Sequence, residues 1–248
     1  PVYSGCLGYA AASSVWNVSA EGISGPYAVT VGATAMTAWC DQRSDGGGWT
    51  LVLNYLHASG TNPALTLHTT TLPGKASDIL GTDESGTASW GHATPGLFAA
   101  LAPTEIRFFG RTSHHGRIIN FATADASCLA YFSTGSGRCG LDWLPVTHHG
   151  LSNHNTYLPR DVDNGFADQG VLAMTNCPFF ASGSRHWGIR GGGNRWEVDD
   201  NGQNDYHTLH RVFTRDRPIG TSCLDILNRG ASVGSGVYPI EPDGPGGR

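Results

Sequence analysis

Short apolar runs separated by turn residues are the feature that most limits how this chain can fold. The runs are rich in β-branched and aromatic residues, which is typical of strands. They cover residues 27–31, 49–53, 106–109, 117–121, 171–175 and 209–214. With 35 glycines among 248 residues and 14% charged residues, the chain suits turns and short strands rather than long solvated helices. We therefore predict an α+β domain of twisted, mainly antiparallel sheets.

Helical signals are few and short. The best covers residues 96–101, after Pro95, and a second lies near residues 10–12. Residues 56–90 and 128–170 are rich in Thr, Ser, Gly, Asn and His and show no periodicity. We expect long surface loops there, which in compact domains usually carry function or metal.

Charge and cysteine content exclude several classes of protein. The net charge of −5 comes without a basic stripe, which argues against a nucleic-acid partner, and no apolar stretch approaches the ~20 residues that cross a bilayer. Six cysteines without a C-x-x-C pair indicate disulfides and a secreted, extracellular protein. Because the sequence begins at Pro1 rather than Met, we expect it to be the mature part of an exported protein.

An internal sequence repeat predicts the domain organisation. Residues 1–7, PVYSGCL, recur as residues 218–224, PIGTSCL, and residues 24–29, SGPYAV, recur as residues 235–240, SGVYPI. We predict one complete module over residues 1–217. Residues 218–248 are then the truncated start of a second similar module, or a C-terminal tail. A coincidental echo in a Gly- and Ser-rich tail is the alternative interpretation.

The order of features from Cys6 to Trp49 carries a family resemblance. After Cys6 come SGPYAV at residues 24–29, WCD ending in Asp41, and DGGGWTL at residues 45–51. Three glycines permit a turn that residues with a Cβ could not make, and Trp49 begins the next core strand. This order resembles the entry segment of fibrinogen-like domains. The resemblance implies that Cys6 pairs with Cys40.

The other four cysteines are less constrained. We predict that Cys128 pairs with Cys139 across the turn-rich segment 133–137. Cys177 and Cys223 remain for a third bridge, but Cys223 echoes Cys6, whose partner has no counterpart in the tail. That pairing stays open.

A second resemblance concerns the region from His186 onward. A histidine precedes a glycine run at residues 191–193, Glu197 follows it, and Asp205-Tyr206 closes the segment. This pattern is similar to the calcium-site segment of intelectins, the X-type lectins built on a fibrinogen-like start. The resemblance implies that His186 and Glu197 contact a calcium ion that holds a sugar diol, while Asp205 holds a neighbouring structural calcium.

The composition of the same loop favours calcium when the residues are considered directly. Residues 197–205 hold four acids and three amides, and Ca²⁺ takes six to eight oxygen ligands from such loops. The DVDNG stretch at residues 161–165 is a second candidate, although it lacks the distant Glu of a full EF-hand loop. Ordinary surface acids are the competing interpretation of both stretches. The candidate metal ligands are His186, Glu197, Asp205, Asp199, Asp200, Asn201, Asp161 and Asp163.

Sugar contacts are expected around this calcium. Its last coordination positions can take two adjacent hydroxyls, and a flanking ring can pack on the apolar face of a pyranose. Tryptophans beside glycine runs more often fill a core, which is the alternative role for two of the candidates. The candidate ligand-binding residues are His186, Glu197, Asn194, Trp187, Trp196 and Tyr206.

Enzymatic chemistry has little support in the sequence. The histidines at residues 114–115, 148–149 and 154 could suggest zinc, but no H-E-x-x-H occurs. Adjacent histidines in a strand would also point to opposite faces. No nucleophile elbow, P-loop or dinucleotide fingerprint is present, so we expect no enzyme.

Two functions remain. The first is a calcium-dependent lectin module that recognises glycan diols, with glycans of the cell surface or matrix as partners. The second is a fibrinogen-like adhesion or assembly module that binds a protein partner and whose calcium is purely structural. The apparent tandem arrangement leaves self-association open, and we expect no insertion into a membrane.

Overall fold

The computed structural model describes residues 5–6, 23–86, 88–135, 146–148, 187–190, 195–200 and 204–216. Its helices are α2 (Pro95–Ala100) and α3 (Ala126–Thr134), with a 3-10 turn, η1 (Ser44–Gly46). Its strands are β1 (Gly25–Val31), β2 (Thr34–Asp41), β3 (Trp49–His57), β4 (Leu67–His68), β5 (Trp90–Ala93), β6 (Glu105–Thr112), β7 (Ile119–Thr123), β8 (Val146–His148), β9 (Trp187–Arg190), β10 (Arg195–Val198) and β11 (Thr208–Arg215).

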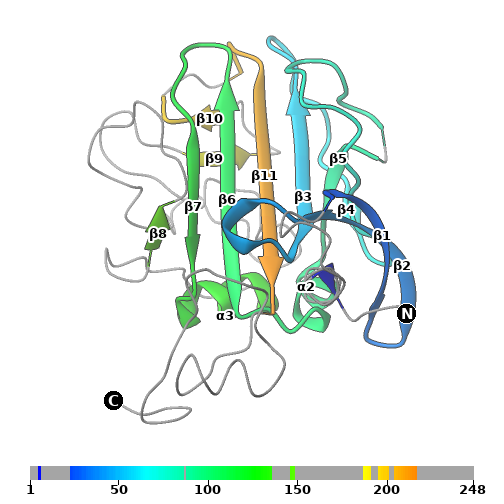
Figure 1. Cartoon of the computed structure of the whole chain (residues 1–248). Coiled ribbons are helices and arrows are strands. Elements are labelled where there is room, and N and C mark those ends of the chain that lie inside the picture. Colours follow the sequence, from blue (N-terminus) through cyan, green and yellow to red (C-terminus); the bar gives the residue numbers. More distant parts are fainter. Residues whose placement is uncertain are drawn as a thin grey trace.

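A nine-stranded sheet forms the body of this part of the chain, and its main path runs β1-β2-β3-β11-β6-β7-β8 (Figure 1). Every pair along that path is antiparallel, whereas the short β4–β5 pair beside β3 is parallel. Strands β9 and β10 form a separate antiparallel pair, drawn behind the large sheet in Figure 1. The α+β architecture of mainly antiparallel sheets with few short helices is therefore confirmed.

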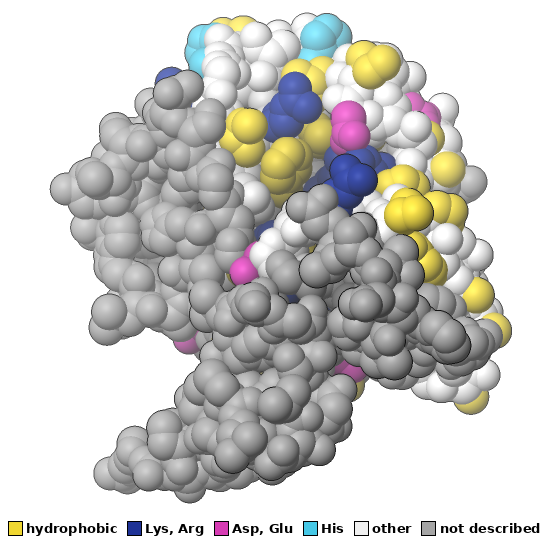
Figure 2. Space-filling model, in the orientation of Figure 1, with side chains coloured by type: hydrophobic (Ala, Val, Ile, Leu, Met, Phe, Trp, Pro, Cys, Tyr) yellow, Lys and Arg dark blue, Asp and Glu magenta, His cyan; other side chains and the backbone are white. Residues whose placement is uncertain are grey.

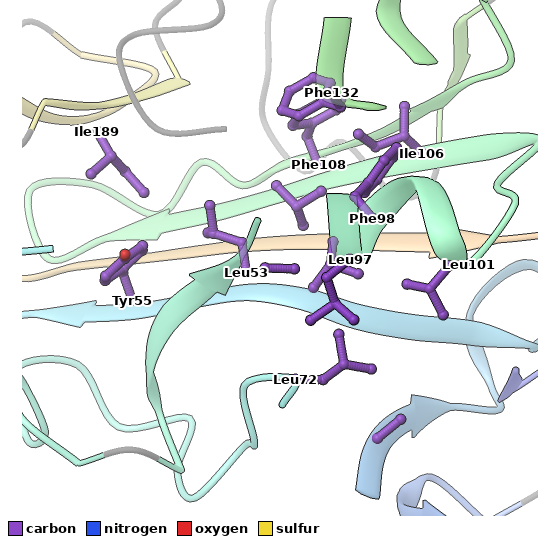
Figure 3. Close-up of a cluster of buried hydrophobic side chains, with 14 of the residues drawn as sticks. Leu53, Tyr55, Leu72, Leu97, Phe98, Leu101, Ile106, Phe108, Phe132 and Ile189 are labelled. Carbon is purple, nitrogen blue, oxygen red and sulfur yellow. The ribbon is translucent and has the colours of Figure 1, made fainter. Parts of the chain in front are cut away.

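The hydrophobic core lies on one face of the large sheet. Alternation along β6 turns Ile106 and Phe108 towards it, because successive side chains of a strand point to opposite faces. The Phe108 ring centroid lies 5.2 Å from that of Phe121, 5.5 Å from Phe132 of α3 and 5.4 Å from Trp187 of β9. Figure 3 shows Ile106 and Phe108 of β6 beside Phe98 of α2 and Phe132 of α3. The helices and the β9–β10 pair thus cover the same face.

The first disulfide closes the entry segment as the fibrinogen-like resemblance implies. Cys6 and Cys40 are bonded across a sequence separation of 34, and both are buried. The glycine turn before β3 is also present. Gly47 has φ of 76°, and a Cβ there would lie 2.7 Å from the carbonyl oxygen of Gln42, so only glycine fits. Cys128 is disulfide-bonded too, but Cys139, Cys177 and Cys223 lie outside the described residues, so its pairing stays a prediction.

The helical expectations were right in one place and wrong in another. The expected helix after Pro95 is α2, which begins where the Thr94 hydroxyl accepts a hydrogen bond from the Leu97 amide. The expected loop from residue 128 instead begins inside α3. Asp125 caps that helix by accepting from the amides of Ser127 and Cys128, and Gly135 ends it in the left-handed conformation. The two capping residues, Asp125 and Gly135, set the ends of a helix whose sequence shows no helical periodicity.

Most expected strands are confirmed. Those at residues 27–31, 49–53, 106–109 and 209–214 lie in β1, β3, β6 and β11, and the one at residues 117–121 begins two positions later, as β7. The strand at residues 171–175, the helix near residues 10–12 and the module boundary at residue 217 fall outside the described residues and stay predictions. No helix among the described residues is long and apolar enough to cross a membrane.

Gly110 sets how closely β9 and β10 approach the large sheet. A Cβ on Gly110 would lie 2.9 Å from atoms of both Trp187 and Val198. We expect Gly110→Ala to lower the free energy of unfolding by about 1–3 kcal/mol, the usual cost of overpacking a core. Gly96→Ala is the control, because a Cβ there meets nothing within 4 Å and the position is helical. Urea unfolding of both variants is the measurement, and equal stability of the two would contradict the close approach.

Candidate functional site

The candidate site lies where two connections between strands meet at one end of the sheet. One is the β6–β7 turn, and the other is the segment between β10 and β11. Thr208 pairs with Thr112 where β11 begins and β6 ends. Beyond that pair, the Ser113 amide donates to the carbonyl of His207 at 2.8 Å, and the His207 amide donates to the Ser113 hydroxyl at 3.1 Å. The register of β6 and β11 therefore holds the two connections together.

Two histidines and one aspartate come together there. Oδ2 of Asp200 lies 3.3 Å from Nδ1 of His114 and 3.7 Å from Nε2 of His115, and potential ligand atoms of the three residues all lie within 4.8 Å of one another. Asp200 is 4% exposed. The argument that adjacent histidines point to opposite faces does not apply to this pair, because residues 113–118 form a bend rather than a strand.

The protonation of His115 is set by its neighbours. The backbone amide of Arg117 donates to His115 Nδ1 at 3.3 Å, which places the proton of the neutral ring on Nε2, facing Asp200. Burial lowers the pKa of His115, and the nearby Arg117 cation adds to the effect. A metal bound at Nε2 would have to displace that proton, so metal binding at this ring requires the other tautomer.

Asp199 has a different role from its neighbour Asp200. Its carboxylate accepts a hydrogen bond from Nε of Arg117, and its carbonyl accepts one from Nη2 at 2.7 Å. The residue has φ of 54°, a left-handed conformation that Asp tolerates better than most residues. Asp199 was expected to be a metal ligand. In the structure these contacts tie the β10–β11 connection to the β6–β7 turn, and the role of Asp199 as a metal ligand stays a prediction.

The other predicted ligands are spread over different environments. Glu197 is fully buried in β10, and its carbonyl accepts from His210 Nε2 at 3.0 Å. Asp205 is exposed, and the ring of the adjacent Tyr206 stacks on His114 at a centroid distance of 4.0 Å. Among the described residues only Asp200, of the acids expected to bind metal, joins a group of three potential ligands. His186, Asn194, Asn201, Asp161 and Asp163 lie outside the described residues.

The two tryptophans expected to contact sugar are core residues. Trp187 and Trp196 are 0% and 1% exposed. Trp196 stacks on His57 with centroids 4.3 Å apart, and the edge of Trp187 meets Phe108. Neither ring offers a face to a ligand at the surface, so the alternative interpretation, that they fill the core, is the one the structure shows.

Sequence reasoning missed the part played by His114 and His115. Asp200, the partner of both histidines, lies 86 positions from His114 in the sequence. No local sequence pattern indicates that the β6–β7 turn meets the segment between β10 and β11. One signal was available, because Ser113 and Gly116 flank the pair and indicate a turn rather than a strand.

Comparison with known proteins finds a likeness of structure only. No protein-family model matches the sequence, and no curated protein matches it. The fibrinogen-like globe domain of human ANGPTL6 is similar with a TM-score of 0.43 and 15% identity, over 87% of this chain and 96% of that one. The fibrinogen-like globe domain of human ANGPTL2 is similar with a TM-score of 0.43 and 14% identity, over 87% of this chain and all of that one. Values this low carry no conclusion about a binding site or a ligand.

Two buried histidines beneath the site make the fold sensitive to acid. Burial lowers the pKa of His57 to about 4, against the opposing effect of Glu84, and lowers that of His210 to about 3. Both rings are neutral in the folded state, whereas in the unfolded chain they take up protons near the ordinary value of 6.5. The stability that they contribute is therefore present above about pH 6.5 and is lost as the pH falls towards 4.

We expect His210→Gln to flatten this dependence. Between about pH 6 and pH 5 the free energy of unfolding of the unmodified protein should fall by ~1 kcal/mol per pH unit for each such histidine, and the variant lacks one of them. Urea unfolding at several pH values measures the slope. Gly110→Ala, which changes stability without removing a titrating group, should keep the original slope. An unchanged slope in His210→Gln would contradict a neutral buried His210.

Proposed function

We propose that the chain is an extracellular, calcium-dependent carbohydrate-binding module of the lectin kind, with its site on the loop of residues 197–205. One observation carries the proposal. Asp200 of that loop lies with His114 and His115 in a group of three potential metal ligands, and Tyr206, the sequence neighbour of the exposed Asp205, stacks on His114. The structural likeness to fibrinogen-like domains supplies no part of this argument.

The donor atoms decide which cation the site suits. Ca²⁺ prefers oxygen, and the loop offers the Asp200 carboxylate, the exposed Asp205 carboxylate and the amide side chain of Asn204. Imidazole nitrogens suit Zn²⁺ and related metals, and two of them face Asp200. We assign calcium because the loop is rich in oxygen donors. The two histidines make zinc the alternative that the experiment must separate.

The recognition of sugar follows from an incompletely coordinated cation. Such an ion takes two adjacent hydroxyls as its remaining ligands, and neighbouring polar groups accept their hydrogen bonds. Among the aromatic residues predicted to flank the site, Tyr206 is the one that is not buried, and its ring lies flat on His114. A pyranose bound at the cation would pack against this pair of rings.

The disulfides support an extracellular location. The Cys6–Cys40 bridge and the bonded Cys128 fit an oxidising compartment, where such bonds form and persist.

The test removes one charge from Asp200. We expect Asp200→Asn to weaken calcium binding about tenfold or more and to weaken sugar binding with it, because a carboxylate ligand is lost. Asp83→Asn is the control, since it removes the same charge from a carboxylate whose one hydrogen bond within the described part of the chain comes from the Gly86 amide. Calorimetry with calcium, with zinc and with a neutral glycan panel measures both steps.

Three outcomes separate the alternatives. Sugar binding restored by calcium after chelation supports the assignment, whereas restoration by zinc alone replaces calcium with a transition metal at the same site. Binding that survives chelation, or that is unchanged in Asp200→Asn, overturns the lectin mechanism. The fibrinogen-like adhesion module with a protein partner would then be the better description.

A further inference from the structure

A cationic groove lies on the face of the large sheet opposite the core. Its volume is about 440 Å³, and it runs over β2, β6, β7 and β11. Figure 2 shows Lys and Arg side chains next to hydrophobic ones on this face. The basic residues that line it are Arg43, Lys75, Arg107, Arg111 and Arg211. Two acids, Asp41 and Asp78, line it as well, so positive charge is in excess although the whole chain carries −5.

The acids use only part of the hydrogen-bonding capacity of these cations. Asp41 accepts from Nη2 of Arg107 at 2.6 Å, and Asp78 pairs with Lys75 at 2.8 Å and with Arg211. Arg107 is 2% exposed, and its Nε and Nη1 are buried without a hydrogen-bond partner among the described residues, so its positive charge acts from beneath the groove rather than by direct contact. Arg111 is half-buried and points from the same face of β6. The groove therefore holds guanidinium groups in excess of the carboxylates that could neutralise them.

Aromatic rings hold these cations in place and form the floor of the groove. The guanidinium of Arg107 lies 4.3 Å from the ring centroid of Phe213, and Nζ of Lys75 lies 5.2 Å from that of Trp39. Trp39 and Phe109 are only partly buried and line the groove. Fixed guanidinium groups beside flat rings match a ligand that carries a carboxylate or sulfate on a ring with an apolar face.

The position of the groove disfavours a peptide ligand. A peptide that adds to a sheet needs an unpaired edge, but β11 is paired with β3 and β6, and β6 is paired with β11 and β7. The groove lies over these paired strands, where main-chain groups are already used. The Asp78 side chain, which is 55% exposed, instead offers carboxylate oxygens that can accept hydrogen bonds from hydroxyls, which a sugar has in abundance.

A second hollow continues the groove. It has a volume of about 290 Å³ and shares Phe109 and Arg111 with the first. Its lining also includes His115 and Arg117, and the Arg117 guanidinium is paired with Asp199. The two hollows together follow β6, with Phe109 and Arg111 at the position common to both.

We propose that this groove binds an acidic oligosaccharide, with a carboxylate or sulfate group held by Arg111, the charge of the buried Arg107 beneath it, and a sugar ring against Trp39 and Phe109. The first hollow, which holds every residue named in this proposal, contains no part of the group formed by His114, His115 and Asp200, although His115 lines the second hollow. The proposal gives a metal ion no role in binding. The inference is therefore independent of the lectin mechanism proposed above.

The experiment uses four probes with chelator present throughout. A hyaluronan tetrasaccharide carries carboxylates only, a keratan-sulfate tetrasaccharide carries sulfates only, chitotetraose is neutral, and polyglutamate is an acidic peptide. Calorimetry gives the affinity for each probe. We expect at least one acidic saccharide to bind at least tenfold more tightly than chitotetraose and polyglutamate, and to weaken as salt is raised. Comparison of hyaluronan with keratan sulfate shows which anion is recognised.

Arg111 is the residue to change, because it is half-buried and its loss leaves the pairing of Arg107 with Asp41 intact. We expect Arg111→Gln to weaken the bound acidic saccharide about tenfold, and Arg111→Lys, which keeps the charge without the planar fork, to weaken it less. Urea unfolding confirms that both variants are folded. Unchanged affinity in Arg111→Gln, equal binding of polyglutamate, or no binding of either acidic saccharide would overturn the proposal. A failure of the lectin mechanism would appear separately, as binding of neutral sugar that is the same with calcium and with chelator.

Discussion

The pairing of β11 with β3 and β6 is the constraint on which the rest of the structure depends. Strand β11 comes last in the described part of the chain, yet it lies in the middle of the sheet, and all of its residues are buried. It pairs with β3 from Thr208 to Thr214 and with β6 from Thr208 to Arg215. Without it the β1-β2-β3 and β6-β7-β8 parts would share no hydrogen bonds along the main path of the sheet, and the two connections at the candidate site would not meet.

The same strand brings charge into the sheet, and that charge organises the loops around it. Arg215 is buried and pairs with Asp45 and Glu105, with its guanidinium 3.9 Å from the ring centroid of Trp49. Arg211 pairs with Asp78 and donates to Asn54 at 2.9 Å. A buried cation is costly unless it is paired, so these residues specify where the loops carrying their partners must lie. Arg107 of β6 pairs with Asp41, and Arg111 extends the row of cations beyond the acids that line the groove, which leaves the groove positive.

The sequence predicted the elements better than it predicted what they bring together. Runs of β-branched and aromatic residues located β1, β3, β6 and β11 because those strands are defined by local composition and flanking turns. Helix α3 was missed because its signal is two capping residues, Asp125 and Gly135, rather than a periodic pattern. The site was predicted only in part. The acidic loop was recognised, but its contact with His114 depends on the pairing of distant strands, which no short segment encodes.

The two faces of the sheet respond to pH in different ways. The stability of the fold depends on pH, whereas the positive charge of the groove does not. On the core side, His57 and His210 are neutral rings. Burial lowers the pKa of both, so protonating either ring in the folded state requires a pH well below its ordinary pKa. The opposite side holds arginines, which stay charged at any pH that the fold survives. Acid therefore weakens the fold before it weakens the charge of the groove. An acidic sugar bound there would keep its cationic partners throughout the pH range in which the sheet remains intact.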